Sequence, residues 1–457
     1  MSEGQLSLPA GAEIFAPLLK LVEDPEIRVR YQLAFTLGEW RDSRAGPALV
    51  QLALRDLKNA ALQTAVLSSA TNHCREMLMA ILTQKTTEVP AELLEKLLGL
   101  ATALGDDTAI ASVLGQIAQP KEGTYLAWQF AAMAGLLDAL DRQKTSLKKF
   151  QDAHQRDLKN LKLSDIFTAA RLRSADAKAS ETERLQAIRL LGRGLSDVPA
   201  DIERLGELLH PEVPSDLQEA ALRRLQSASG ANVGEVILAG WKGYGPSLRT
   251  EVLNLLFSRP EWLQTLVSAI ESEKISTAGI GTVHQQKLLT SSDSAIRQRA
   301  VKLFSATRHD RQSVVRDYRT VEKLTGDPAK GSMLFRQNCS TCHRFKGEGF
   351  EIGVDLNTLT GKPVEVLLVA ILDPNQAVEA RYVNYTASTK NGREISGVIT
   401  AETPTSISIR SPGGNEEVIL RSDLSALTSS GLSLMPEGFE KALNPQDLAD
   451  LISYIRQ

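Results

Sequence analysis

The sequence predicts a mainly α-helical protein in two parts: a helical repeat domain over residues 1–324, and a smaller domain over residues 325–457 with a small antiparallel β-meander inserted at about residues 381–429. Three observations predict this. Apolar residues recur at spacings of three and four from about Ala12 to Ala306. A helix stop and start signal, EKLTGDPAKG, follows Val321. The apolar period changes to two after Asn375.

The first part consists of short amphipathic segments with Ala-rich faces, which allow helices to approach closely. The phrase DPEIRVR, beginning at Asp24, returns in looser form as DSAIRQRA, beginning at Asp293. Helical hairpins that each bury one face against the next are typical of α-solenoids, and these segments resemble HEAT repeats. The chain of 457 residues also exceeds one ordinary domain of roughly 100–200 residues.

The elements of the second part follow in order. We expect a helix from Gly331 into Cys339, a Gly-rich loop over residues 347–361, and a helix over residues 363–372. Alternating segments at 382–389, 394–400, 405–410 and 416–421 predict strands, and Asn391-Gly392 predicts a tight hairpin turn. A last amphipathic helix covers residues 448–455 after a start signal at 444–447.

Composition excludes several classes of partner. The formal net charge is only -3 for 52 basic and 55 acidic residues, so no overall field attracts nucleic acid or an anionic membrane. The apolar run at 364–372 is far shorter than the roughly 20 residues needed to span a bilayer. We therefore expect no nucleic-acid partner and no membrane span.

The chemistry is concentrated in Cys339-Ser340-Thr341-Cys342-His343, a CxxCH motif. Two cysteines on one helical turn can form two thioethers along one edge of a porphyrin, and the adjoining histidine can then ligate the iron. The motif predicts one covalently attached haem c bound by Cys339, Cys342 and His343. We expect no catalytic residues in addition.

Two other interpretations of the motif are a redox CxxC pair and half of a zinc site. The redox pair would need a βαβ pattern, whereas residues 331–338 read as a helix with no strand before it. A zinc site needs further Cys or His ligands, but no histidine follows His343. The third cysteine, Cys74, lies in the helical part and is read as a packed core residue.

The second axial ligand is predicted to be Met435. It is the sole methionine after His343, and a thioether is a suitable sixth ligand for haem iron. Pro436 restricts the backbone beside it. The alternative is that Met435 fills space in the core. We predict iron ligation by His343 and Met435.

Residues 331–457 resemble a class I cytochrome c domain, with Gly331 and Phe335 on the first helix, CxxCH at its end and Tyr454 on the last helix. The resemblance implies that the first and last helices cross at the glycine. Many members have Gly-Pro after the haem motif to orient the histidine, whereas this chain has Gly353-Val354; the Val354 carbonyl could accept from His343 Nδ1 instead.

The complete pattern is similar to the haem-binding domain of PVC-type cytochromes. It comprises HEAT-like helices, GDPAKG before CxxCH, then LDPN, KNGREISGVI and SLMPEGF. The resemblance implies an electron-transfer module that accepts electrons from a fused dehydrogenase domain or a redox partner protein and passes them to a respiratory acceptor, with the solenoid as scaffold or docking surface. We expect a carrier in a dehydrogenase system rather than a self-sufficient enzyme.

Two alternatives remain open at this point. The haem could instead serve a sensor or enzyme that binds a gas or peroxide at an open iron site, or the HEAT-like array could be a protein-interaction scaffold with a regulatory haem. Met435 separates the first alternative from electron transfer, because a stable sixth ligand closes the iron.

The predicted location follows from the chemistry of thioether attachment, which is completed outside the cytoplasm. We expect a periplasmic or otherwise extracytoplasmic protein, although the segment MSEGQLSLPAGAEIF lacks the features of a signal peptide. We therefore expect this chain to be the C-terminal portion of a longer exported protein, or a mature form with a new initiator Met. A chain made without haem-attachment machinery is expected to lack the haem.

Overall fold

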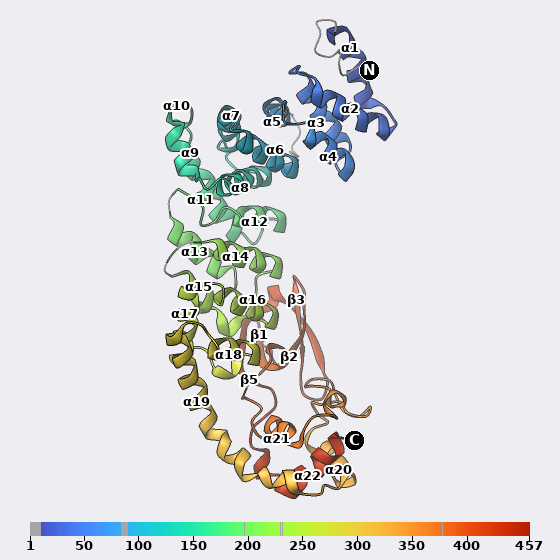
Figure 1. The fold of residues 1–457 in the computed structure, drawn as a ribbon, viewed down its shortest axis with the longest axis vertical. Helices are drawn as coiled ribbons and strands as arrows, with labels where there is room; N and C mark the ends of the chain where they lie inside the picture. Colours follow the sequence, from blue (N-terminus) through green and yellow to red (C-terminus); the bar gives the residue numbers. More distant parts are fainter. Residues whose placement is uncertain (1–10, 84–89, 196, 229, 231, 377) are drawn as a thin grey trace. The chain divides into compact units, whose positions relative to one another are not determined.

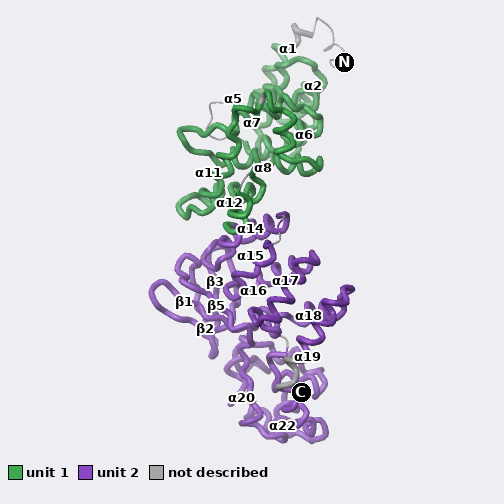
Figure 2. Tube along the Cα trace, turned by 90° about the vertical axis from the view of Figure 1, so that its left-hand side faces the viewer, with its two compact units in different colours: residues 1–204 green, residues 205–457 purple. Residues whose placement is uncertain are grey.

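The computed structural model describes residues 11–83, 90–195, 197–228, 230, 232–376 and 378–457. It is mainly helical, with one small antiparallel sheet in the C-terminal half (Figure 1). The chain divides into two compact units, residues 1–204 and residues 205–457 (Figure 2). Each unit is described by itself.

In the first unit, several helices pack against the helix two positions along the chain. Thus α2 packs on α4, α3 on α5, and α6 on α8. The helices are α1 (Gly11–Lys20), α2 (Ile27–Glu39), α3 (Ala45–Arg55), α4 (Ala60–Ser68), α5 (Cys74–Thr83), α6 (Ala91–Leu104), α7 (Asp107–Ile117), α8 (Ala127–Arg142), α9 (Leu147–Ala153), α10 (Gln155–Leu158), α11 (Leu163–Ala175) and α12 (Glu181–Ile188), with α13 (Val198–Glu207) crossing the division.

Small residues permit the close approach of these helices. A Cβ atom on Gly38 would lie 2.5 Å from the Ser69 Cβ, and one on Gly46 would lie 2.5 Å from the Glu76 Cβ. The Cys74 side chain is buried in the same apolar core, and its Sγ donates to the Leu97 carbonyl at 3.3 Å. Burial raises the pKa of this thiol to about 12, so Cys74 behaves as a packed core residue.

The second unit begins with further helices and continues into the predicted second domain. Helix α14 packs on α16, α15 on α17, and α17 on α19. The helices are α14 (Ser215–Ser227), α15 (Val233–Ala239), α16 (Pro246–Leu256), α17 (Pro260–Glu271), α18 (Thr282–Leu289), α19 (Ser294–Asp317), α20 (Pro328–Asn338), α21 (Val364–Leu372) and α22 (Pro445–Ile455). The helices predicted at 331–338, 363–372 and 448–455 are therefore present.

The sheet has five antiparallel strands in the order β4-β3-β2-β1-β5. Its strands are β1 (Val383–Thr389), β2 (Glu394–Glu402), β3 (Ser406–Arg410), β4 (Glu416–Leu420) and β5 (Leu424–Ser433). The first four strands and the turn at Asn391-Gly392 were predicted, and Gly392 adopts a φ of +83° there. Strand β5, which pairs with β1, was not predicted.

The sheet packs against the helices of the same unit through buried polar contacts as well as apolar ones. The Tyr385 hydroxyl in β1 donates to the Tyr244 carbonyl at 3.1 Å. Arg421, which follows β4, donates to the Pro211 carbonyl at 3.0 Å. Both side chains are buried. The predicted boundary near residue 325 stays a prediction, but contacts of this kind join residues on its two sides.

Helices α20 and α22 cross at a glycine, as the resemblance implied. A Cβ atom on Gly331 would lie 2.0 Å from the Asp450 carbonyl oxygen and 2.7 Å from the Tyr454 Cβ. The rings of Phe335 and Phe345 pack on the ring of Tyr454, with centroids 5.9 Å and 5.1 Å away. This crossing fixes the helix that leads into Cys339. No helix in the described part of the chain has the length and apolarity needed to cross a membrane.

Candidate functional site

The CxxCH residues form one turn that continues helix α20. The Cys339 carbonyl accepts from the Cys342 amide at 3.0 Å and from the His343 amide at 2.8 Å. The helix begins at Pro328, and Asp327 caps it, because the Asp327 carboxylate accepts from the Ala329 and Lys330 amides. The three side chains are therefore presented together by a short rigid segment.

His343 is oriented by the loop that follows the motif. Its Nδ1 lies 2.8 Å from the Val354 carbonyl oxygen. Because a carbonyl can only accept, Nδ1 carries the proton, and Nε2 keeps a lone pair for a metal. Burial lowers the pKa of the imidazole, and the Val354 contact opposes that shift. The neutral ring required of an iron ligand is thus favoured, and Val354 has the role expected of it.

Gly353 gives the histidine ring its space. A Cβ atom at this position would lie 2.5 Å from the His343 Cε1. The loop is held there because the Ile352 and Gly353 amides both donate to the Cys342 carbonyl, at 3.0 and 2.8 Å. The glycine of the Gly353-Val354 pair is therefore required by the close approach of the backbone to the ring.

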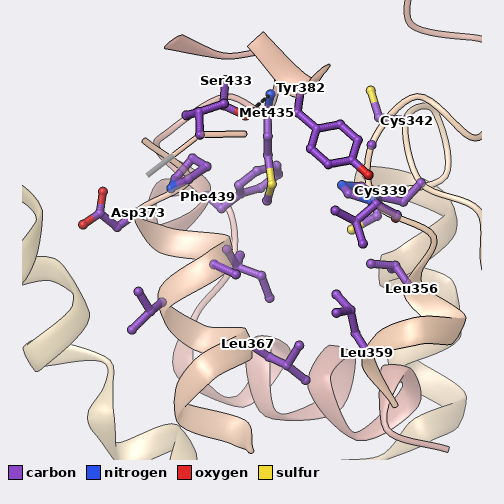
Figure 3. A pocket seen from close by; sticks show the side chains of 18 of the residues that line it. Cys339, Cys342, Leu356, Leu359, Leu367, Asp373, Tyr382, Ser433, Met435 and Phe439 are labelled. Carbon is purple, nitrogen blue, oxygen red and sulfur yellow. Dashed lines mark hydrogen bonds between the residues drawn. The ribbon is translucent and has the colours of Figure 1, made fainter. Parts of the chain in front are cut away.

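Cys339, Cys342, His343 and Met435 all line a single cavity of about 770 Å³. In Figure 3 the Met435 side chain points its sulfur into the cavity, and Cys339 and Cys342 belong to another part of its wall. Apolar side chains from η6 (Leu356–Leu359), α21 and α22 complete the lining, among them Leu356, Leu359, Leu367, Ile371, Leu451 and Ile455. The structure thus brings together all four predicted site residues, from segments 92 positions apart in sequence (435 minus 343).

Several lining residues were not predicted from the sequence. Tyr382, the last residue of the 3-10 turn η7 (Ala380–Tyr382) before β1, lies over the cavity (Figure 3), and burial raises the pKa of its hydroxyl. Thr282, at the start of α18, lies outside the second domain as it was predicted. An aromatic residue before a strand and a threonine at the first position of a helix are ordinary in sequence. Neither position carries a signal that could have marked it.

The cysteine thiols are not poised for redox or metal chemistry of their own. Burial raises the pKa of Cys339 to about 12 and also raises the pKa of Cys342, whereas reactive cysteines have depressed pKa values. Among the residues that the structure describes, no three His, Cys, Asp or Glu side chains gather as a metal site. These observations disfavour the redox CxxC and zinc interpretations.

The cavity fits a haem in both size and chemistry. Its volume lies within the roughly 300–1,000 Å³ typical of small-molecule and cofactor sites, and its lining is largely apolar. Two thiols stand beside a neutral histidine with a free Nε2, and a thioether faces the same space. These are the groups that covalent attachment and axial ligation of haem c require.

Comparison with known proteins agrees with this geometry. The Cytochrome c family model matches residues 328–457. A search of the curated proteins found no match. The C-terminal part of the chain is accordingly a cytochrome c domain, and its cofactor is a covalently bound haem c, for which Cys339 and Cys342 are present. The domain also indicates haem-based electron transfer.

Proposed function

We propose that the chain is a monohaem electron carrier in which His343 and Met435 are the axial ligands. The observation that carries the proposal is the convergence of Cys339, Cys342, His343 and Met435 on one apolar cavity, with His343 Nδ1 committed to the Val354 carbonyl. When bound, the haem supplies one-electron transfer between ferric and ferrous iron. The chain contributes ligands, orientation and exclusion of water.

Each structural feature supports transfer rather than chemistry at the iron. His343 and the Met435 thioether would together hold the haem iron, and a thioether ligand would raise the reduction potential. The apolar lining from α21 and α22 lowers the local dielectric constant and so disfavours the more highly charged oxidised state. An open site for a gas or peroxide would lack such a resident ligand.

The test compares Met435→Ala with a matched control, Met333→Ala. Met333 is 54% exposed on α20 and is absent from the cavity lining. We expect Met435→Ala to change the iron-ligand absorption spectrum and lower the reduction potential by more than about 59 mV, the one-electron equivalent of a tenfold change in equilibrium constant. We expect Met333→Ala to leave both unchanged.

Covalent attachment is tested on the denatured polypeptide. A chain matured with haem-attachment machinery is expected to keep its haem absorbance after heating and denaturation, and Cys339→Ala with Cys342→Ala is expected to lose it. A matured chain without any haem, or a Met435→Ala chain with the parental spectrum and potential, would overturn the corresponding part of the proposal.

We further propose that the helices before α20 form a HEAT-like α-solenoid that serves as scaffold or docking surface. Support comes from the packing of several helices on the helix two positions along, such as α2 on α4, α6 on α8 and α15 on α17, which recurs within both units.

The proposed electron donor is a dehydrogenase, fused or separate, and the proposed acceptor is a respiratory component in the periplasm. Substitutions on the exposed face of the array should slow reduction by that donor without altering the haem spectrum, and unchanged kinetics would contradict the docking role.

A further inference from the structure

Met435 lies on a short loop, residues 434–438, between the end of β5 at Ser433 and the 3-10 turn η9 (Phe439–Lys441). At its start, the Ser433 amide donates to the Asn375 Oδ1 at 2.8 Å. The Leu434 amide donates to the Tyr382 carbonyl at 3.2 Å, and the Met435 amide donates to the Ser433 Oγ at 3.1 Å. Hydrogen bonds therefore hold the backbone at Leu434 and at the residue on each side of it, up to Met435 itself.

The end of the same loop is held by the residues that follow α21. The Asn375 Nδ2 donates to the Glu437 Oε1 at 2.7 Å. One asparagine side chain thus connects the beginning and the end of the loop across Met435. Asn375 lies just after α21, whose side chains line the haem cavity.

Arg311 of α19 also holds the segment that follows Met435, and it lies outside the residues that the cytochrome c family model matches. Its Nη1 and Nη2 donate to the two carboxylate oxygens of Glu440 at 2.9 and 2.8 Å. Its Nε and Nη2 also donate to the Leu372 carbonyl at 2.9 and 2.6 Å. The Arg311 and Glu440 side chains are only 16% and 15% exposed.

The Arg311 guanidinium donates hydrogen bonds to two acceptors, the Leu372 carbonyl and the Glu440 carboxylate. The Leu372 carbonyl belongs to the last turn of α21 and has no helical amide to accept from. Glu440 is a largely buried carboxylate that needs a cation. A planar guanidinium with several donors can satisfy both groups in one fixed geometry, whereas an ammonium group cannot reproduce the bidentate pair. Arg311 consequently links the end of α21 to η9, immediately after the Met435 loop.

A third contact from the same helical connection adds to this linkage. The Tyr318 hydroxyl lies 2.9 Å from the Glu440 carbonyl oxygen and 3.0 Å from the Leu443 carbonyl oxygen, and it can donate to either. Tyr318 directly follows α19. Arg311 in the C-terminal part of α19 and Tyr318 directly after it therefore both contact the segment after Met435, and neither belongs to the haem motif.

We propose that Arg311 is a positioning residue for Met435, which with Asn375 and Tyr318 keeps the thioether directed into the haem cavity. The inference rests on the proposed function, because it assumes that Met435 ligates the iron. Loss of the linkage leaves the thioether in place but lets its loop open more often. An external ligand can then compete for the sixth position.

The test is an imidazole titration of the ferric, haem-loaded full chain, followed by absorption. We expect Arg311→Met to bind imidazole about tenfold more tightly than the parent, because the open form becomes about tenfold more populated, which corresponds to about 1.4 kcal/mol. Arg311→Lys should lie between the two. The control is Arg316→Met on the same helix, where the side chain is 75% exposed, and parental affinity is expected.

The outcomes separate the inference from the function on which it depends. Met435→Ala, measured in the same titration, should bind imidazole most tightly, because its sixth ligand is gone. Tight binding by Met435→Ala with parental binding by Arg311→Met would overturn the role of Arg311 alone. Parental binding by Met435→Ala would remove the ligand assignment itself. If Arg311→Met does not fold, Glu440→Gln replaces it, because it removes the carboxylate that Arg311 binds, with the same expected gain and the same refuting result.

Discussion

Gly353 is the residue for which the structure gives the sharpest prediction. In Gly353→Ala the new Cβ would lie 2.5 Å from Cε1, 2.9 Å from Nδ1 and 3.0 Å from Nε2 of His343. Since carbon atoms pack comfortably at about 3.5–4.0 Å, the ring or the loop must move by about 1 Å. The bond between Nδ1 and the Val354 carbonyl, now 2.8 Å long, would then exceed the roughly 3.2 Å limit of a normal hydrogen bond.

The magnitude follows from these two losses. Overpacking costs about 1–3 kcal/mol, and the lost hydrogen bond adds about 0.5–1.5 kcal/mol. The sum is roughly 1.5–4.5 kcal/mol, which at about 2–4 °C per kcal/mol for a unit of this size lowers the melting temperature by roughly 3–18 °C. The loaded chain should also show an altered iron-ligand spectrum, because the free Nε2 is no longer aimed as before.

The assay is thermal unfolding by circular dichroism, together with absorption spectra of the loaded chain. Gly361→Ala is the matched control: it lies at the end of the same loop, and an added Cβ there meets no atom within 4 Å. We expect the control to retain the parental melting temperature and spectrum. A Gly353→Ala chain that matched the control in both measurements would refute the idea that this glycine makes room for the histidine.

Two further predictions concern the framework around the site. Gly331→Ala should destabilise the haem domain by about 1–3 kcal/mol or more, because the new Cβ would lie 2.0 Å from the Asp450 carbonyl oxygen. The control is Gly115→Ala, in which the new Cβ meets no atom within 4 Å. Urea unfolding of both variants measures the difference, and equal stabilities would contradict the prediction. The hydrogen bond from Arg311 lowers the pKa of Glu440 below its ordinary value of 4.5. The pair therefore stabilises the fold above about pH 4.5 and loses that contribution as the pH falls through the lowered value. The parent should exceed Glu440→Gln in stability at pH 7 and lose the advantage as the pH falls below 4.5 and through the lowered pKa of Glu440, and an advantage that persists in acid would count against the pair.

The residues of the site were largely predictable because the attachment chemistry is local. Cys339, Cys342 and His343 must lie on one helical turn, and this constraint produces the fixed CxxCH spacing that is recognisable in the sequence. Met435 was reachable by elimination, as the sole methionine after His343. The structure places all four on one cavity, although iron ligation by Met435 stays a prediction.

Strand β5 was not predictable from the same patterns. Its sequence, LSALTSSGLS, is rich in serine, and its buried positions do not alternate regularly along the strand. Gly431 also adopts a φ of +70° within it. The strand forms because β1 offers a free edge on which it can pair, and this is a tertiary cause that a period-two search does not detect. The sheet consequently extends to Ser433, directly before the Met435 loop.

The least predictable part of the site is its dependence on helices far from the motif. The sequence changes character near residue 325, since apolar periodicity and composition report local structure. The cavity is nevertheless lined by Thr282, and the segment after Met435 is held by Arg311. Such contacts join residues 129 positions apart, as in Arg311 and Glu440, and leave no pattern in either segment. The family motif therefore specifies how the haem is attached, whereas we propose that α19, which precedes the family match, helps to hold the loop that carries Met435.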